Sequence, residues 1–194
     1  MKILALSAHT DDIEFACGAS INRWITEGAE VHAVSFTSAS AQKKEFEESS
    51  KVLGIKNTEL FQYPVRRFGE FRQRILDEMV YLERRIQPDI VLVPSSTDTH
   101  QDHQVIRDEG FRAFKRHSLL GYEMPQNNLS FQTNLFVRVS GLDIHIKVQS
   151  LRCYESQKHR PYITEEFIRS LALVRGMQAG CKYAEAYEVI RWMI

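Results

Sequence analysis

Two short segments of this chain concentrate histidine and aspartate, side chains that commonly bind divalent metals in enzymes. The first is residues 9–12, His-Thr-Asp-Asp, and the second is residues 95–103, which ends in His-Gln-Asp-His. His9 and Asp12 stand three residues apart, so one turn of chain can bring both side chains to a single point. With His103 as a third ligand, they predict a site for a borderline divalent ion such as zinc, with an open position for water.

Two further aspartates beside these candidate ligands have the chemistry to assist a metal-dependent reaction. Asp11 is adjacent to a ligand but is expected to point elsewhere, which leaves it free to act as a base. Asp102 can orient a ligand histidine by pairing with its other ring nitrogen. A structural interpretation stays open for each residue alone, because Asp11 and Asp12 can cap a helix and the histidines can lie in surface loops. The concentration of both residue types in two segments favours a metal site.

The elements expected around these segments place them at one edge of a sheet. Apolar runs alternate with patterns of helical spacing from the first residues onward. This order predicts an α/β fold with a mostly parallel sheet and helices on both faces. Each segment directly follows a strand, where α/β proteins bind ligands. The strands expected before residue 100 are 3–6, 31–36, 59–63 and 89–94, and the helices are 13–25, 41–53 and 71–86.

The remainder of the chain is less regular. The spacing predicts a helix over 102–115, a strand over 135–139, helices over 146–154 and 165–177, and a last strand over 188–192. Residues 121–134 form the longest irregular stretch, and loops of this length are often functional. Because no repeat or flexible linker is present, a single domain is expected over residues 1–194.

The overall composition excludes several functional classes. The 194 residues carry 25 Lys and Arg against 25 Asp and Glu, and 43% of them are hydrophobic. The net charge of zero argues against a nucleic-acid partner, and the hydrophobic share argues against disorder. The apolar run at residues 3–6 is too short for a signal peptide or a membrane span, so we expect a cytoplasmic protein without a membrane partner. The three cysteines are widely separated and are expected to be reduced thiols.

Four motifs together resemble those of a known family. Residues 8–14, Ala-His-Thr-Asp-Asp-Ile-Glu, followed by Cys17-Gly18, resemble the (A)HPDD(I)E…(C)G signature of the LmbE-like family, the relatives of N-acetylglucosaminyl-phosphatidylinositol de-N-acetylase, PIG-L. Residues 100–103 look like the HxDH motif of that family, and Ser-Gln at 156–157 and the segment 183–187 resemble two later motifs. Thr10 stands where the family usually has proline, and Ala19-Ser20 stands where it usually has Gly-Thr. Neither position supplies a candidate ligand or base.

The resemblance implies a Rossmann-like three-layer sandwich and zinc-dependent hydrolysis of an N-acyl group, typically the acetyl of an amino sugar. In that reaction Zn²⁺ would activate a water molecule, and Asp11 would take its proton. His100 would stabilise the oxyanion and is expected to do so best when protonated. Asp102 would hold a histidine in the required tautomer. Imidazole and carboxylate ligands select weakly among metals, so another divalent ion stays open.

The substrate is expected to be a small N-acylated amino sugar or sugar conjugate. Arg66 and Arg67, which follow the third strand, are candidate substrate-binding residues, with a solvated basic pair as the alternative. Asn128 in the long loop is a candidate for binding sugar hydroxyls. The family resemblance also implies assembly into a homo-oligomer. Two other functions stay open, an Asp/His metal-dependent phosphoesterase and a non-catalytic metal-dependent sugar-binding module, although the latter would not need Asp11.

Overall fold

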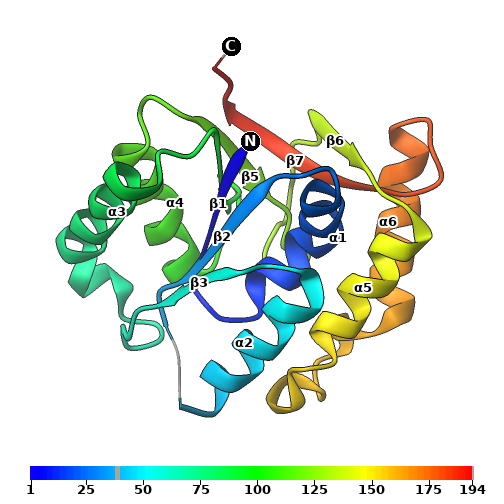
Figure 1. Ribbon diagram of the computed structural model, residues 1–194, viewed down its shortest axis with the longest axis horizontal. Helices are drawn as coiled ribbons and strands as arrows, with labels where there is room; N and C mark the ends of the chain where they lie inside the picture. The colour runs from blue at the N-terminus through cyan, green and yellow to red at the C-terminus, as the bar shows by residue number, and fades with distance from the viewer. Residues whose placement is uncertain (38–39, 194) are drawn as a thin grey trace.

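The computed structural model describes residues 1–37 and 40–193, and its centre is a seven-stranded sheet (Figure 1). The strands are β1 (Lys2–Ser7), β2 (Glu30–Ser35), β3 (Asn57–Leu60), β4 (Ile90–Pro94), β5 (Ser118–Tyr122), β6 (Leu135–Arg138) and β7 (Ala184–Arg191). Their order is β3-β2-β1-β4-β5-β7-β6. The first five strands pair in parallel, and β7 runs antiparallel to both of its neighbours. The expectation of a mostly parallel sheet is confirmed.

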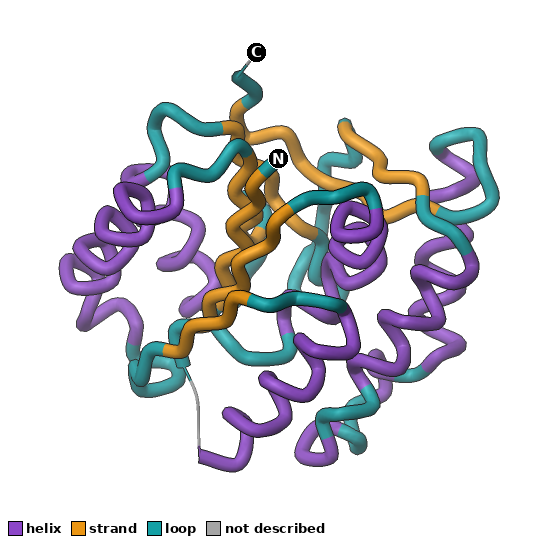
Figure 2. Tube along the Cα trace, in the orientation of Figure 1, coloured by secondary structure: helices purple, strands orange, loops and turns teal. Residues whose placement is uncertain are grey.

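Helices cover both faces of this sheet, which gives three layers (Figures 1 and 2). The helices are α1 (Asp12–Thr26), α2 (Ser40–Leu53), α3 (Arg72–Ile86), α4 (Gln101–Ala113), α5 (Gly141–Leu151) and α6 (Glu165–Gln178). One face packs against α3 and α4, and the opposite face packs against α1, with α2, α5 and α6 beside it. In the described part of the chain, no helix has the length and apolar character needed to cross a membrane.

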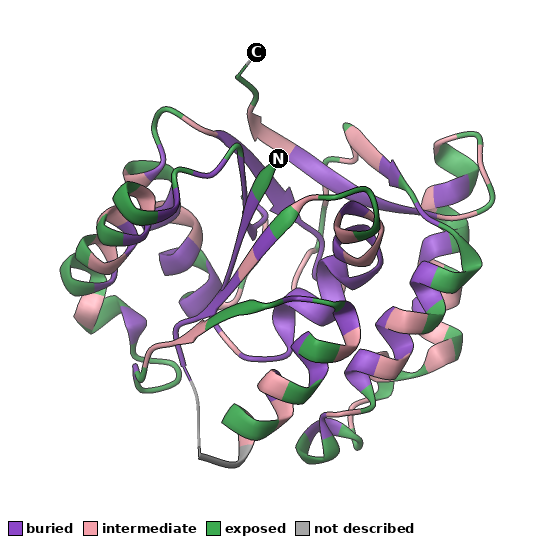
Figure 3. Cartoon of the chain, in the orientation of Figure 1, coloured by how far each residue is buried: buried purple, intermediate pink, exposed green. Residues whose placement is uncertain are grey.

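The short apolar run of strand β1 contributes side chains to the hydrophobic cores on both faces of the sheet. Ile3 and Ala5 point into the core under α1, whereas Leu4 and Leu6 point into the core under α3 and α4. All four side chains are fully buried, and Figure 3 shows the central strands buried along most of their length. A strand covered on both faces needs apolar residues at every position, which is why this run does not alternate.

Three elements of the C-terminal half differ from the expectations. Strand β5 was not predicted, because its run Ser-Leu-Leu-Gly-Tyr is short and contains a glycine. That glycine, Gly121, is required by packing, since a Cβ atom there would lie 2.8 Å from the Cα of Ser95. Strand β7 begins at Ala184 rather than residue 188. Helix α5 begins at Gly141 rather than residue 146, where Ser140 forms a capping box with Asp143.

The strand order determines where the site lies. Chain connections run from β1 outward through β2 to β3, and then return to place β4 on the other side of β1. Ligands in open α/β sheets bind at such a reversal, beyond the carboxyl ends of the two adjacent strands. The segments that follow β1 and β4 contain residues 9–12 and 95–103, so the two histidine- and aspartate-rich segments meet there.

Candidate active site

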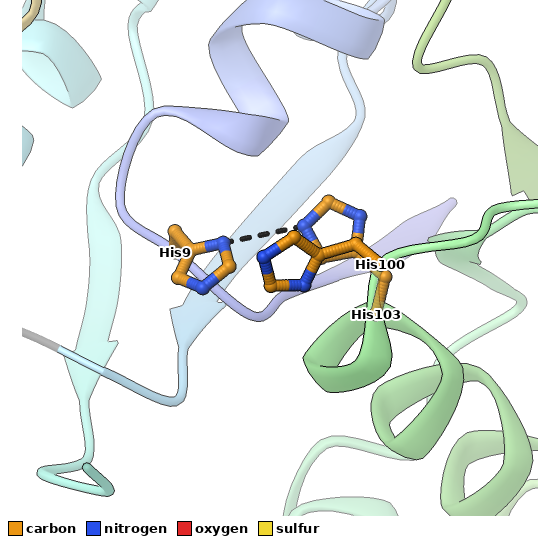
Figure 4. Close-up of side chains that lie close together, drawn as sticks. All are labelled: His9, His100 and His103. Carbon is orange, nitrogen blue, oxygen red and sulfur yellow. Dashed lines mark hydrogen bonds between the residues drawn. The ribbon is translucent and has the colours of Figure 1, made fainter. Parts of the chain in front are cut away.

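Three candidate ligand atoms converge on one point beyond the ends of β1 and β4. His9 Nδ1 lies 3.2 Å from His103 Nε2, and Asp12 Oδ2 lies 3.3 Å from His103 Nε2 and 3.6 Å from His9 Nδ1. Figure 4 shows His9 approaching from the loop after β1, while His100 and His103 come from the start of α4. With metal bonds of about 2.0–2.2 Å, tetrahedral ligands lie roughly 3.3–3.6 Å apart. The spacing therefore fits a small divalent cation.

The local structure at the start of α1 sets the positions of the two aspartates. Asp12 is the first residue of the helix, and its Oδ2 accepts the backbone N–H of His9 at 2.8 Å, which ties the two candidate ligands together. Asp11 occupies the N-cap position, yet its side chain makes no capping hydrogen bond. The capping interpretation therefore does not account for Asp11, whose carboxylate instead lines the cavity described below.

A carboxylate stands behind each of the two candidate ligand histidines. Asp102 Oδ2 lies 3.3 Å from His9 Nε2, and Asp98 Oδ2 lies 2.7 Å from His103 Nδ1. Asp102 therefore pairs with the histidine from the distant segment rather than with its neighbour. Asp98 was not among the predicted site residues. Its place two residues before His100, in a polar loop after a strand, was the available signal. Such outer carboxylates fix the ring orientation of metal ligands.

The electrostatics of this cluster favour a bound cation. Burial lowers the pKa of His9, but the Asp12 and Asp102 carboxylates outweigh it and raise that pKa to about 9. Burial likewise lowers the pKa of His103, but Asp12 and Asp98 raise it to about 10. Burial raises the pKa of Asp12, but the two imidazolium charges hold it well below its usual range. The carboxylates thus hold positive charge at the position that a metal would occupy.

His100 differs from the other two histidines. Its Nδ1 accepts the backbone N–H of Asp102 at 3.2 Å, so the neutral ring carries its proton on Nε2. Burial and the positive charges of His103 and His9 lower the pKa of His100. Two neighbouring cationic rings thus oppose a charge on His100, and the expectation that His100 acts best when protonated stays a prediction. The neutral ring still offers one donor, Nε2–H.

A cavity of about 290 Å³ opens beside the candidate ligands. His9, Asp12, His100 and His103 line it together with Asp11. Burial and the charge of Asp12 raise the pKa of Asp11. The guanidinium of Arg160, whose Nη1 lies 3.7 Å from Asp11 Oδ2, lowers this pKa but does not cancel the increase. The cavity therefore brings a carboxylate with raised basicity next to the candidate metal position.

The three predicted substrate-binding residues are placed differently. Arg66 lines the cavity, and its backbone adopts φ 66, a left-handed conformation held by a 2.6 Å hydrogen bond from its N–H to Asp102. Arg67 points away and pairs with Glu70 on the surface.

Asn128 does not line the cavity either. Its amide nitrogen donates to Ser95 and Thr97, and its amide oxygen accepts the N–H of Met124, so its side chain is used in holding the loop. Its neighbour Asn127 lines the cavity instead. Three further lining residues, Gln157, Arg160 and Tyr162, were not predicted as site residues. The Ser-Gln motif at 156–157 was the available signal for Gln157, whereas no local pattern connects Arg160 and Tyr162 to residue 11.

Comparisons with known proteins match the chain to a de-N-acetylase family and to two relatives named as deacetylases. The family model described as GlcNAc-PI de-N-acetylase, PIG-L, matches residues 4–114. The "Uncharacterized deacetylase YaiS" of Escherichia coli is 28% identical over 172 residues, covering 79% of this chain and 90% of that protein. The diacetylchitobiose deacetylase of Thermococcus kodakarensis is 23% identical and covers 97% of this chain and 83% of its own length.

The chain also resembles solved structures over its full length, and one of them is named as a hydratase. The 4-carboxy-2-hydroxymuconate hydratase GalB of Pseudomonas putida has a TM-score of 0.82 at 20% identity, covering 100% of this chain and 97% of that one. At this identity the likeness concerns the fold alone, so the reaction has to be argued from the side chains.

Proposed function

The chain belongs to the GlcNAc-PI de-N-acetylase family, PIG-L, a family of N-deacetylases, and from this premise we propose that it is a zinc-dependent hydrolase that removes the N-acetyl group of an amino sugar or sugar conjugate. The observation that carries the proposal is the convergence of His9 Nδ1, Asp12 Oδ2 and His103 Nε2 beside Asp11 in one cavity. The named activity of the diacetylchitobiose deacetylase supports an amino-sugar substrate.

Zinc is the metal that these ligands fit best, since two imidazoles, one carboxylate and an open position are typical of catalytic zinc. Held by His9, Asp12 and His103, it would act as a Lewis acid that polarises the acyl carbonyl and makes water more acidic. Manganese or iron would also accept these ligands, so metal analysis of the purified protein has to accompany every activity measurement.

The chain's own residues account for the proton transfers. The oxygen of the attacking water bonds to the acyl carbon, and Asp11 accepts a proton from this water. His100 donates its Nε2–H to the oxyanion that develops on the acyl oxygen. When the carbon–nitrogen bond breaks, Asp11 returns the proton to the leaving nitrogen, so the products are acetate and a free amino sugar. Asp102 and Asp98 keep His9 and His103 oriented throughout.

The compartment and assembly belong to the same proposal. We place the enzyme in the cytoplasm, which suits three cysteines that form no disulfide in the described part of the chain. The partner is a small molecule rather than a nucleic acid or a membrane. A homo-oligomer stays a prediction that light scattering on the purified chain tests.

Asp11→Asn is the first test of this mechanism. The variant should keep one zinc per chain and lose deacetylation by roughly 100- to 10,000-fold, because the amide cannot accept the proton. Release of free amine from N-acetylated amino sugars measures activity, and atomic absorption measures zinc. Asp108→Asn, a change of the same kind at a surface carboxylate that pairs with Arg72 and Arg107, is the matched control.

Three outcomes would contradict the proposal. Full activity in Asp11→Asn would remove Asp11 as the base. Protein that contains no metal after purification without chelators, and that binds none when zinc is added, would contradict the ligand set. Hydrolysis of phosphate esters without hydrolysis of amides would favour the phosphoesterase alternative.

A further inference from the structure

Two arginines line the same cavity as Asp11 and the candidate metal ligands. Arg66 is exposed and lines the cavity, and its only described hydrogen bond uses its backbone N–H. In the described part of the chain, its guanidinium has no hydrogen-bonding or ionic partner. By contrast, the guanidiniums of Arg67 and Arg175 are each held by two bonds to a carboxylate. Arg66 therefore offers a cavity-facing set of donors that the fold itself does not use.

Arg160 has the same property on the wall next to the base. Its Nη1 donates to the Tyr162 hydroxyl and lies 3.7 Å from Asp11 Oδ2, which is too long for a hydrogen bond. Within the residues that the structure describes, Nε and Nη2 have no hydrogen-bond or ionic partner, and the guanidinium carbon Cζ lies 5.7 Å from the centre of the Tyr162 ring. The side chain is 40% exposed although it reaches the nearly buried Asp11. The guanidinium therefore lies beside the base, is partly exposed, and keeps Nε and Nη2 available to a ligand in the cavity.

Gln157 provides an independent indication that this wall meets a ligand. The residue is 7% exposed and lines the cavity, and its amide nitrogen donates to Ser156 Oγ at 3.2 Å. Its amide oxygen is buried and has no hydrogen-bond partner in the described part of the chain. A buried acceptor without a donor is uncommon in native proteins. A hydroxyl of a bound sugar would satisfy it.

We infer that Arg160 and Arg66 determine specificity by binding an anionic group, a phosphate or a carboxylate, carried by the N-acetylated amino sugar. The inference rests on the proposed deacetylase function and narrows its substrate class. A guanidinium offers a planar fork of N–H donors that matches phosphate and carboxylate oxygens. Because the net charge of the chain is zero, such a substrate is recognised through these local groups rather than through a long-range field.

The test compares anionic and neutral substrates on zinc-loaded enzyme. The substrates are N-acetylglucosamine 1-phosphate, N-acetylglucosamine 6-phosphate, N-acetylmuramic acid and neutral N-acetylglucosamine. At least one anionic sugar should have a kcat/KM at least 10-fold above that of N-acetylglucosamine at low ionic strength. The two phosphates and the carboxylate of N-acetylmuramic acid distinguish the kind of anion.

Arg160 lies 3.7 Å from the base Asp11, so Arg160→Gln also changes kcat on the neutral sugar, and the readout is therefore selectivity. Arg160→Gln and Arg66→Gln should each raise KM for the preferred anionic sugar at least 10-fold and lower the ratio of kcat/KM for that sugar to kcat/KM for N-acetylglucosamine at least 10-fold. Arg152→Gln, which removes a surface arginine that pairs with Glu165, should change neither value. Arg160→Lys keeps the charge but loses the fork, and should recover only part of the selectivity.

The outcomes separate this inference from the proposed function. Equal kcat/KM for neutral and anionic sugars, or an equal loss on both in Arg160→Gln, would overturn the inference while leaving the deacetylase intact. If none of the four sugars is cleaved, the proposed function fails for these amino-sugar substrates. The inference about anion binding is then tested by measuring binding affinities with calorimetry. Glucosamine 6-phosphate or glucosamine 1-phosphate should then bind at least 10-fold more tightly than glucosamine, and Arg160→Gln should abolish the difference at unchanged zinc content. Equal affinities would overturn it.

Discussion

Each candidate ligand histidine presents one ring nitrogen to the metal position and the other to a buried carboxylate. His9 is held by Asp102, and His103 is held by Asp98. These carboxylates are 0% and 2% exposed, so their charges act at close range with little screening by water. Asp12 and these two carboxylates raise the pKa of His9 to about 9 and that of His103 to about 10. A cation must therefore displace protons from them on binding.

Replacing either outer carboxylate should weaken metal binding without removing a ligand. We expect Asp98→Asn and Asp102→Asn each to lower zinc affinity by roughly 10- to 100-fold, because the ring they orient gains freedom and loses basicity. Competition with a chromogenic chelator measures the affinity. Unchanged affinity in both variants would show that the rings are fixed by other contacts, and Asp108→Asn again serves as the control.

Glu14 provides a prediction about stability and pH. It is fully buried in α1, where Ser49 and Tyr154 contact Oε1 and Oε2 has no described partner. Burial raises its pKa to about 8, from an ordinary value near 4.5. Between these values the folded chain keeps a proton that the unfolded chain has lost. This group's contribution to stability is therefore present below pH 4.5 and declines as pH rises towards 8, by at most roughly 5 kcal/mol.

Glu14→Gln removes this titration. The free energy of unfolding of the wild type should fall, relative to that of the variant, as the pH rises from 5 to 8. The difference between the two free energies should be smallest at pH 5. Urea unfolding at several pH values with saturating zinc measures the difference. Glu48→Gln, at an exposed position, is the control, and its free energy of unfolding should depend on pH in the same way as that of the wild type. If Glu14→Gln also showed the wild-type pH dependence, Glu14 would not be protonated in the folded chain.

Helix α1 carries Asp11 and Asp12 at its start and is held further along by a buried ion pair. Lys147 on α5 contacts Glu185 on β7, and both residues are buried. Glu185 also accepts the backbone N–H groups of Ala19 and Ser20 at 3.3 and 2.7 Å. Gly18 leaves space for the aliphatic part of the Lys147 side chain, since a Cβ atom at residue 18 would lie 3.1 Å from Lys147 Cγ. Three elements are thus joined behind the site.

Breaking this pair should destabilise the whole domain. Lys147→Met leaves Glu185 buried without a counter-charge, which costs about 3–5 kcal/mol by analogy with other buried pairs. The double variant Lys147→Met, Glu185→Gln should recover part of the loss, because the amide still accepts a hydrogen bond from α1. Chemical denaturation measures both. No loss in the single variant would contradict a stabilising role for this ion pair.

In the whole molecule, the candidate site exists only when the sheet is assembled. His9 and His103 are 94 residues apart in sequence and meet because β1 and β4 are neighbours at the reversal of strand order. An unfolded chain cannot present both ligands at a fixed distance. Metal binding is therefore linked to folding.

Removing zinc should lower the thermal stability of the chain. A metal at about 1,000 times its dissociation constant adds about 4 kcal/mol, which for a chain of this size raises Tm by roughly 8–16 °C. Differential scanning calorimetry with zinc and with a chelator measures the shift. His103→Gln should show little or no zinc-dependent shift, and an equal shift in that variant would place the metal elsewhere.

The sequence alone determined the residue types of the site and the class of fold. Metal chemistry restricts ligands to a few side chains, and the local spacing of His9, Asp11 and Asp12 could be read without a structure. Apolar strands alternating with helices were sufficient to predict the parallel sheet. Only the tertiary structure decided that Asp98 supports His103 while Asp102 supports His9, that β5 and β7 complete the sheet, and that Arg160 reaches Asp11. Such pairings depend on strand order and on contacts between distant segments, whereas periodicity and motif spacing report only on neighbours along the chain.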